Sequence, residues 1–438
     1  MIIIDSAISK RHTEKNPVKI GILGSGAMAK GLIQHINSHD YGIKVVCTYG
    51  RSLKKLQAMF DSIDINDYQI ADNTNDVERA FQNNLPAICT DADILIKSDV
   101  VDLVVEMTGA IEFGAKAILS SFEYGKHVLS FNAELDATLG PYLVREAKKA
   151  GLKYSVADGD QPGVSMNLYR YVKGIGLKPL VIGNIKGMLD RYRNPFTQEG
   201  FAKKWGMQAS MVTNFADGTK LSLEQACIAN ATDSKVAITG MYGYESKEHI
   251  DQLTHLFDYE ELLEKGSIVD YILGAKPGPG VFIYAASEHK YLTKFLEYSK
   301  LGKGPLYSFY VPYHLLYLEI PNSIIRLMDY DDSTLEPQEN LNVEVVSLAK
   351  KDLNPGDLLD GIGGYAAYGI CENSDQVDSL EHIPIGLTKG IKLKNSVSKD
   401  KFITFKDVEI PTSNYLFNLY KKQLTMLKRN NGNVKVTL

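Results

Sequence analysis

Short apolar runs alternate with longer helical segments along the first 160 residues. A polar arm is predicted at residues 1–15, and helices are predicted at 113–124 and 141–150. The apolar runs predict strands at residues 18–23, 44–49, 87–90, 100–107, 125–132 and 152–157. Strands that alternate with helices in this way indicate a doubly wound parallel sheet, whose ligands bind beyond the carboxyl ends of the strands.

The pattern changes after residue 158. A helix is predicted at 164–174 and strands at 180–185 and 281–284, in a segment of mixed α and β character. Short strands and turns follow at 340–410, and the chain then carries a helical segment at 415–427. We therefore predict an α/β chain of three domains: a Rossmann domain at 1–158, an α+β catalytic and dimerisation domain at 159–335, and a small β-rich domain with a helical tail at 336–438.

The first apolar run leads into the glycine-rich turn Gly24-Ser25-Gly26, which opens a helical segment. With Ala29 in third place, the turn has the G-x-G-x-x-A pattern of dinucleotide-binding folds. Gly24 would form the tight turn, Gly26 would let the backbone approach a pyrophosphate, and Ala29 would allow close helix–strand packing. The amides at the helix N-terminus would hold the phosphates. The predicted cofactor contacts in this turn are Gly24, Ser25, Gly26, Ala27 and Met28.

The end of the second strand favours NADP over NAD. An NAD-binding domain carries an acid there, about 20 residues beyond the glycine turn, for the ribose 2′-hydroxyl. This chain instead reads Tyr49-Gly50-Arg51-Ser52, with two lysines close behind. Arg51 and Ser52 would hold a 2′-phosphate, which an acid would repel. The alternative is that Arg51 is a solvent-exposed loop charge.

Polar residues also follow later strands of the predicted sheet. Three of them are predicted to contact the cofactor: Thr108, Gly109 and Asn132. Glu134, Asp158 and Asp160 would gather carboxylates near the nicotinamide, where they could act in acid–base chemistry, hold substrate hydroxyls or bind a divalent metal ion. The alternative for Asp158 and Asp160 is that they cap the helix that follows them.

Hydride transfer also needs a group that protonates or stabilises the substrate oxygen. Lys186, at the end of strand 180–185, is the first candidate; the alternative is a surface lysine. Asp190 is a second catalytic candidate. Arg191, Arg193 and Lys204 would bind a carboxylate or phosphate. The alternative for this group is a solvated helix start capped by Asn194-Pro195.

His314 is a further candidate, as a general acid. The alternative is a histidine with a structural role in a core or interface.

Composition limits the classes of molecule that the chain is expected to bind. The 438 residues are 44% hydrophobic and 23% charged, with a net charge of −5, so no basic excess indicates nucleic acid or a membrane surface. The four cysteines are scattered, which favours reduced thiols over disulfides or a zinc site. No apolar stretch has the length of a signal peptide core or a membrane span, and we expect a cytoplasmic protein.

Beyond the glycine turn, the chain resembles homoserine dehydrogenases. Asp158-Gly159-Asp160-Gln161-Pro162-Gly163, a helix, a strand and then Gly183-Asn184-Ile185-Lys186-Gly187 resemble the entry to the catalytic domain of that family. Asn132-Ala133 follows a strand, as the Asn-Lys pair of the family does, and Glu134 stands where the family has a lysine after Asn-Ala.

The turn Ala349-Lys350-Lys351-Asp352-Leu353-Asn354-Pro355-Gly356-Asp357 resembles the branch that carries a C-terminal SAF domain. That branch includes the 1-deoxy-D-xylulose 5-phosphate reductoisomerase-like enzymes. The resemblance implies a Rossmann domain, a nicotinamide cofactor and a SAF-like domain at the C-terminus.

The sequence therefore predicts a homo-oligomeric NADP-dependent oxidoreductase acting on a small anionic metabolite: a sugar phosphate, a sugar acid or an amino-acid relative. One alternative is reductive isomerisation of 1-deoxy-D-xylulose 5-phosphate, which needs a metal ion or an equivalent electrophile. A second is a non-catalytic NADP-binding regulatory protein. The exact substrate stays open at this point.

Overall fold

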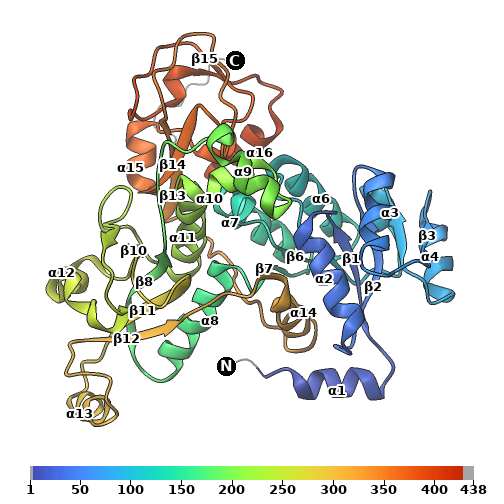
Figure 1. Ribbon diagram of the computed structural model, residues 1–438, viewed down its shortest axis with the longest axis horizontal. Coiled ribbons are helices and arrows are strands. Elements are labelled where there is room, and N and C mark those ends of the chain that lie inside the picture. The colour runs from blue at the N-terminus through green and yellow to red at the C-terminus, as the bar shows by residue number, and fades with distance from the viewer. Residues whose placement is uncertain (1–2, 428–438) are drawn as a thin grey trace. The chain divides into compact units, whose positions relative to one another are not determined.

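The computed structural model describes residues 3–427, which fold into two compact units (Figure 1). The first unit contains the chain up to Asp136, Gly140–Gly163 and Leu315–Glu336. The second contains Ala137–Leu139, Val164–His314 and the chain from Pro337 onward. The chain thus returns to the first unit at Leu315, after residues 164–314 of the second. The predicted three-domain division at 158 and 335 stays a prediction.

The first unit contains a seven-stranded parallel sheet in the order β3-β4-β2-β1-β5-β6-β7. The strands are β1 (Val18–Leu23), β2 (Ile43–Tyr49), β3 (Gln69–Ile70), β4 (Ala87–Cys89), β5 (Leu103–Glu106), β6 (His127–Ser130) and β7 (Tyr154–Val156). Helices α2 (Ala27–Ser38), α3 (Leu53–Asp61), α4 (Thr74–Gln82), α5 (Ala92–Ile96), α6 (Ile111–Glu123) and α7 (Ala133–Lys149) connect them. The predicted doubly wound parallel sheet is confirmed.

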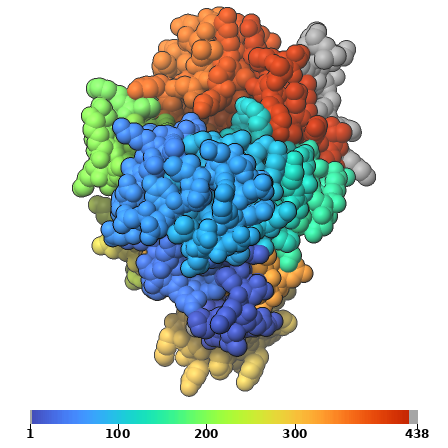
Figure 2. Space-filling model, turned by 90° about the vertical axis from the view of Figure 1, so that its right-hand side faces the viewer, coloured from blue at the N-terminus to red at the C-terminus, as the bar shows by residue number. Residues whose placement is uncertain are grey.

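Two expectations for this unit were wrong. The polar arm contains a helix, α1 (Asp5–Thr13), because Ala7 is buried and the Arg11 Nε donates to Asp329 at 2.7 Å. The helix predicted from residue 141 begins eight residues earlier, because the Asn132 side chain caps it and Pro141 is accommodated inside it. In Figure 2 this unit presents a continuous blue and cyan face, with α1 in dark blue at its edge.

The returning segment belongs to the core of the first unit. Helix α14 (Ile320–Asp329) follows the short helix η3 (Leu316–Leu318). Its residues Ile320, Ile324, Ile325 and Leu327 are fully buried in the cluster that also holds β1 and α2. The Leu316 amide donates to the Gly159 carbonyl at 2.8 Å, which fixes the start of the segment beside the end of β7.

The second unit is built on a mixed five-stranded sheet in the order β12-β11-β8-β10-β9. Its strands are β8 (Lys178–Lys186), β9 (Tyr244–Glu245), β10 (Ile268–Leu273), β11 (Gly280–Ala286) and β12 (Leu306–Val311). The helices are α8 (Gln161–Gly174), α9 (Pro195–Trp205), α10 (Ala209–Ala216), α11 (Thr219–Thr232), α12 (Tyr259–Lys265) and α13 (Lys290–Tyr298). β8 and β10 run parallel, so their carboxyl ends meet at one edge.

The last part of the second unit is β-rich and small. A hairpin of β13 (Val343–Ala349) and β14 (Ala367–Asn373) packs against α11. Helix α15 (Ser374–Leu380), strands β15 (Lys392–Leu393) and β16 (Val408–Glu409), and helix α16 (Tyr415–Met426) follow. The predicted helical segment at 415–427 is therefore present. Within residues 3–427 no helix is long and apolar enough to cross a membrane.

Candidate functional site

The glycine turn lies at the point where the sheet order of the first unit reverses. β1 has β2 on one side and β5 on the other, so the loops after β1 and β5 meet at this edge. Gly24 has a φ of +146°, and a Cβ there would lie 3.0 Å from the carbonyl oxygen of Met107. Only glycine allows this close approach of the two loops. Ligands of doubly wound sheets bind at such a point.

The N-terminus of α2 is open to an anion. Gly26 is its N-cap residue, no side chain caps the helix, and its first turn has no acid. The first amides of a helix have no intrahelical partner, so those of the predicted contacts Ala27 and Met28 are suited to phosphate oxygens. Ala29 is 1% exposed, as expected for the small residue that packs against the sheet.

The end of β2 lies directly against the glycine turn. A Cβ on Gly50 would stand 2.8 Å from the Ser25 side chain, so the two loops touch. Arg51 is exposed beside this contact, where a cationic side chain can meet a 2′-phosphate. The Ser52 hydroxyl accepts a hydrogen bond from the Lys55 amide at 3.4 Å and caps α3. Arg51 is therefore better placed than Ser52 to recognise a 2′-phosphate.

A buried glutamate organises the predicted residues at the ends of β5 and β6. Glu106 is fully buried and accepts hydrogen bonds from the Thr108 amide at 2.8 Å, from the Thr108 hydroxyl and from the Asn132 side chain at 2.9 Å. Burial raises the pKa of Glu106, and these hydrogen bonds partly offset the shift. Asn132 also caps α7 through the Leu135 amide. Thr108 and Asn132 thus meet through Glu106, next to Gly109.

The predicted carboxylates of the first unit lie in different surroundings. Glu134 is half-buried in the first turn of α7. Asp158 is 2% exposed, and its Oδ1 accepts from the Gly159 amide at 2.9 Å. Asp160 accepts from the Gln161 amide at the start of α8, in agreement with the capping alternative. Burial and the neighbouring Asp158 raise the pKa of Glu319 on the returning segment.

These carboxylates do not form a metal centre by themselves. Among the described residues, no three histidine, cysteine, aspartate or glutamate side chains are grouped as metal ligands. The divalent metal stays a prediction.

Lys186 lies at the end of β8 in the second unit, within a polar cluster. Its Nζ is 3.4 Å from the Glu224 Oε2, and the Asn184 side chain donates to the same oxygen at 3.1 Å. The Glu224 side chain is 4% exposed and that of Lys186 is 21% exposed. Lys186 is therefore not a free surface lysine: it keeps solvent access while a buried carboxylate orients it.

Arg191 lies on the same face of this sheet. Asn184 on β8 and Tyr271 on β10 are register partners, so their side chains lie on the same face of the sheet. Lys186 lies two residues beyond Asn184 on β8, so its side chain lies on that face as well. Arg191 interacts with the hydroxyls of Tyr271 and Tyr368, and its guanidinium stands 5.6 Å from the Tyr368 ring centre. Burial raises the pKa of Tyr368 to about 12 although Arg191 lowers it. The structure thus favours an ordered arginine over a solvated one.

The other predicted residues of the second unit have different roles in the structure. Asp190 pairs with Arg193 at 3.0 Å and accepts from the Tyr192 amide, so it organises the loop. Asn194 and Thr197 form a capping box at the start of α9, as the alternative expected. Lys204 is exposed on α9, and His314 is half-buried after β12.

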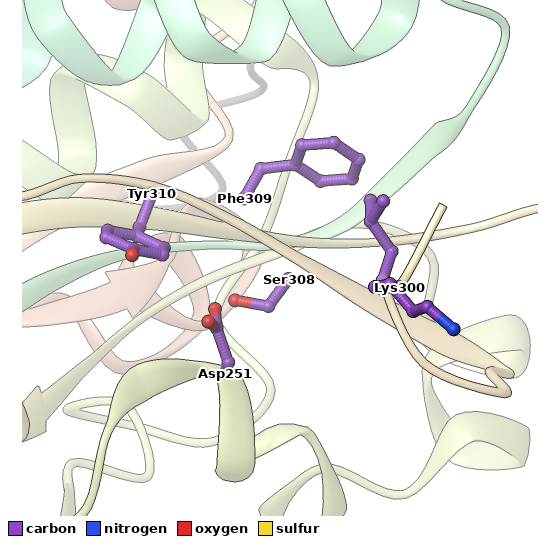
Figure 3. Close-up of a pocket in the computed structure, with 6 residues that line it drawn as sticks. Asp251, Lys300, Ser308, Phe309 and Tyr310 are labelled. Carbon is purple, nitrogen blue, oxygen red and sulfur yellow. The ribbon is translucent and has the colours of Figure 1, made fainter. Parts of the chain in front are cut away.

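A hollow of about 300 Å³ elsewhere in the second unit contains none of the predicted residues. In Figure 3 the Ser308 hydroxyl and the Asp251 carboxylate face each other across it, while the Lys300 amine points away. Phe309 and Tyr310 complete much of the wall.

Several residues of these clusters were missed or undervalued from the sequence. Glu106 is the one charged residue of an otherwise apolar strand, directly before Thr108-Gly109. Glu224 lies in α11, where every residue except Lys220 is buried. A charge inside an apolar element is the feature that could have identified both. Tyr271 and Tyr368 carried no such feature.

Two family models match the chain: one describes a cofactor-binding domain and the other a catalytic domain. Residues 24–157 match the NAD-binding domain of homoserine dehydrogenase. Residues 159–320 match the catalytic domain of oxidoreductase DRL. The predicted resemblance to homoserine dehydrogenase-like oxidoreductases is confirmed, and the chain carries the domains of a dehydrogenase or reductase. The predicted SAF domain stays a prediction.

Individual relatives are distant. Homoserine dehydrogenase of Bacillus subtilis is 25% identical over 148 residues, which are 32% of this chain and 30% of the relative. Homoserine dehydrogenase of Synechocystis sp. is 25% identical over 137 residues, or 31% and 28% of the two chains. The chain thus spans about a third of the length of the curated relatives it matches.

Among solved structures, a homoserine dehydrogenase from Thiobacillus denitrificans has 14% identity, with a TM-score of 0.45 over 76% of this chain and 82% of that one. A DOX-P reductoisomerase in complex with NADPH, fosmidomycin and magnesium has 17% identity, with a TM-score of 0.36 over 50% and 59%.

Proposed function

We propose that the chain is an NADP-dependent oxidoreductase that acts on the carbonyl or hydroxyl group of a small anionic metabolite, such as a sugar phosphate, a sugar acid or an amino-acid relative. One observation carries the proposal: Lys186 and Arg191 share one sheet face in a chain whose other unit has a dinucleotide-binding turn. A lysine suits proton transfer and an arginine suits an anionic group.

The residues of the first unit would bind the cofactor. The glycine turn and the N-terminus of α2 would hold the pyrophosphate, and Arg51 the 2′-phosphate. When bound, the nicotinamide supplies or accepts the hydride. Glu106 keeps the Thr108 and Asn132 side chains in fixed positions at the ends of β5 and β6.

The residues of the second unit would act on the substrate. Lys186 would donate a proton to the oxygen during reduction and remove it during oxidation. The Glu224 carboxylate, 3.4 Å from the Lys186 Nζ, fixes the direction of the lysine side chain. Arg191 would bind the anionic group. Homo-oligomerisation belongs to the same proposal.

Cofactor choice can be tested with Arg51→Ala. We expect NADPH affinity to fall by about 10- to 100-fold, because one charge-assisted contact is lost, while NADH affinity stays unchanged. Thermal shift titrations with both nucleotides measure this, with Lys10→Ala on α1 as a control of equal charge change. The absence of a shift with either nucleotide in the wild type would contradict the dinucleotide site itself.

Catalysis can be tested with Lys186→Ala. The wild type is screened for NADPH oxidation with 1-deoxy-D-xylulose 5-phosphate and small sugar-acid carbonyls. On any active substrate, Lys186→Ala should lower kcat by about 10²- to 10⁴-fold with NADPH binding retained. Lys178→Ala, at the exposed opposite end of β8, is the matched control and should keep its activity. Full turnover in Lys186→Ala would exclude this role for the lysine.

A further inference from the structure

The loop that carries Arg191 and Arg193 is held by residues more than 150 positions further along the chain. The Lys350 ammonium group, at the end of the β13 strand, donates to the Arg193 carbonyl at 2.8 Å and to the Gly364 carbonyl at 2.8 Å. It also pairs with the Asp217 carboxylate at 2.7 Å, and these two side chains are 3% and 0% exposed. A buried lysine is thus committed to fixing the backbone of the loop.

A second contact holds the side chains of the same loop. The Tyr192 hydroxyl donates to Asp400 at 2.9 Å, and the Tyr368 hydroxyl donates to the other oxygen of that carboxylate at 3.1 Å. Tyr368 in turn lies against the Arg191 guanidinium. Asp400 therefore connects the loop to the tyrosine that supports its arginine.

We propose that the C-terminal segment, residues 337–427, sets the affinity of the site for the anionic group of the substrate, by fixing the position of the Arg191 guanidinium. Tyr192, Tyr368 and Asp400 are positioning residues in this proposal, and Arg191 is the residue that touches the substrate. The inference rests on the proposed function, because it assigns Arg191 to substrate binding. The ligand group is an oxyanion, either phosphate or carboxylate.

The physical reason is the geometry of arginine. A guanidinium presents its donors in a rigid planar fork, so its affinity for an oxyanion depends on its orientation. A loop arginine held by two tyrosine hydroxyls and by an ordered backbone loses less freedom on binding than a mobile one. Removing these contacts should therefore weaken binding without changing the chemical step.

The test uses the full chain and three variants: Tyr192→Phe, Tyr368→Phe and the double variant. Each removes only a hydroxyl, so the folded volume is kept. Asp400→Asn is the conservative variant: Asp400 has a φ of +62°, which asparagine tolerates, and its amide oxygen keeps one of the two tyrosine bonds. Tyr365→Phe, on an exposed side chain of the same segment, is the matched control.

Two measurements are made on each protein. Hydrogen exchange of the amides of residues 187–194 reports the order of the loop. NMR titration with inorganic phosphate and, separately, with malonate reports anion affinity and distinguishes the two oxyanions. We expect loop exchange about five- to tenfold faster and affinity for the preferred anion about five- to tenfold weaker in each single variant, with a smaller effect in Asp400→Asn and none in Tyr365→Phe. On any active substrate, KM should rise while kcat is kept.

Faster loop exchange with unchanged anion affinity and KM would show a purely structural role and overturn the proposal, as would unchanged exchange in the double variant. A wild type that binds neither phosphate nor malonate would overturn the oxyanion assignment. Failure of the proposed oxidoreductase would appear separately, as the absence of NADPH binding in the wild type.

Discussion

Single residues show how differently this chain uses a buried acid. Glu106 and Glu224 are each surrounded by side-chain donors from other elements, which they orient. Asp270 on β10 is fully buried too, but it accepts only backbone amides: those of Tyr242, Gly243 and Tyr271, at 2.7 to 3.0 Å. The first two acids organise candidate sites, while the third fixes the turn that precedes β9.

Asp270 should make stability depend on pH. Burial raises its pKa from 3.8 to about 6, more than the three amides lower it. Because the native state then binds the proton more tightly than the unfolded chain, this contribution is fully present below about pH 4 and is lost as the pH rises through about 6. Asp270→Asn removes the titration, so the stability of the wild type relative to this variant should fall by about 2 kcal/mol between pH 4 and pH 7.

Urea unfolding of both proteins across that pH range measures the difference. Asparagine also leaves one backbone amide without its acceptor, so an offset that does not vary with pH is expected in addition. Parallel pH profiles for the two proteins would show that Asp270 does not titrate in this range.

At the scale of elements, the junctions between strands and helices carry the candidate chemistry. The loop after β8 returns to the end of α10, where the Asp190 amide donates to the Ala216 carbonyl at 2.9 Å. Gly218, just before α11, has a φ of +83°, and a Cβ there would lie 2.8 Å from the Leu189 side chain. The packing of Leu189 and its loop against α11 therefore requires a residue without a side chain at position 218.

Gly218→Ala should destabilise the protein by about 1–3 kcal/mol, because alanine is strained at this φ and would displace Leu189. Gly187→Ala is the matched control in the same loop: a Cβ at Gly187 meets nothing within 4 Å, so its effect should stay within about 0.5 kcal/mol. Urea unfolding of the two variants tests this. Equal stability of both would mean that the loop does not need the glycine.

At the scale of the whole molecule, the first unit is discontinuous in sequence. Leu315–Glu336 returns to it, and four fully buried side chains of α14 enter the core around β1. Burial of one such side chain contributes roughly 1.5–3 kcal/mol, so together they approach the total stability of a typical domain.

The fragment 1–163 should therefore lack a cooperative thermal transition and should not bind NADPH. Because the Leu316 amide donates to the Gly159 carbonyl, a short flexible linker from Gly163 to Leu315 can restore the missing segment. Calorimetry and NADPH titration of the fragment and of the linked protein provide the test. A cooperative transition in the fragment without residues 315–336 would show that α14 is dispensable.

The local patterns of the sequence were sufficient for the parallel sheet and the glycine turn. Strand positions follow from runs of apolar residues, and the turn follows from the backbone freedom that only glycine supplies at Gly24. These features depend on neighbours in sequence, so they can be read without long-range contacts. The same holds for the oxidoreductase class, because its characteristic residues are close together in the chain.

The sequence by itself therefore determined the fold class, the dinucleotide-binding turn and the oxidoreductase resemblance, along with Lys186 and Arg191 as candidates. The tertiary structure decided what surrounds them. Glu224 reaches Lys186 because α11 packs on the β8 sheet, and the β13–β14 segment brings Tyr368 to Arg191. Such contacts join residues dozens to hundreds of positions apart, and no local periodicity encodes which distant charge or ring will meet. The return of α14 to the first unit is invisible in the sequence for the same reason.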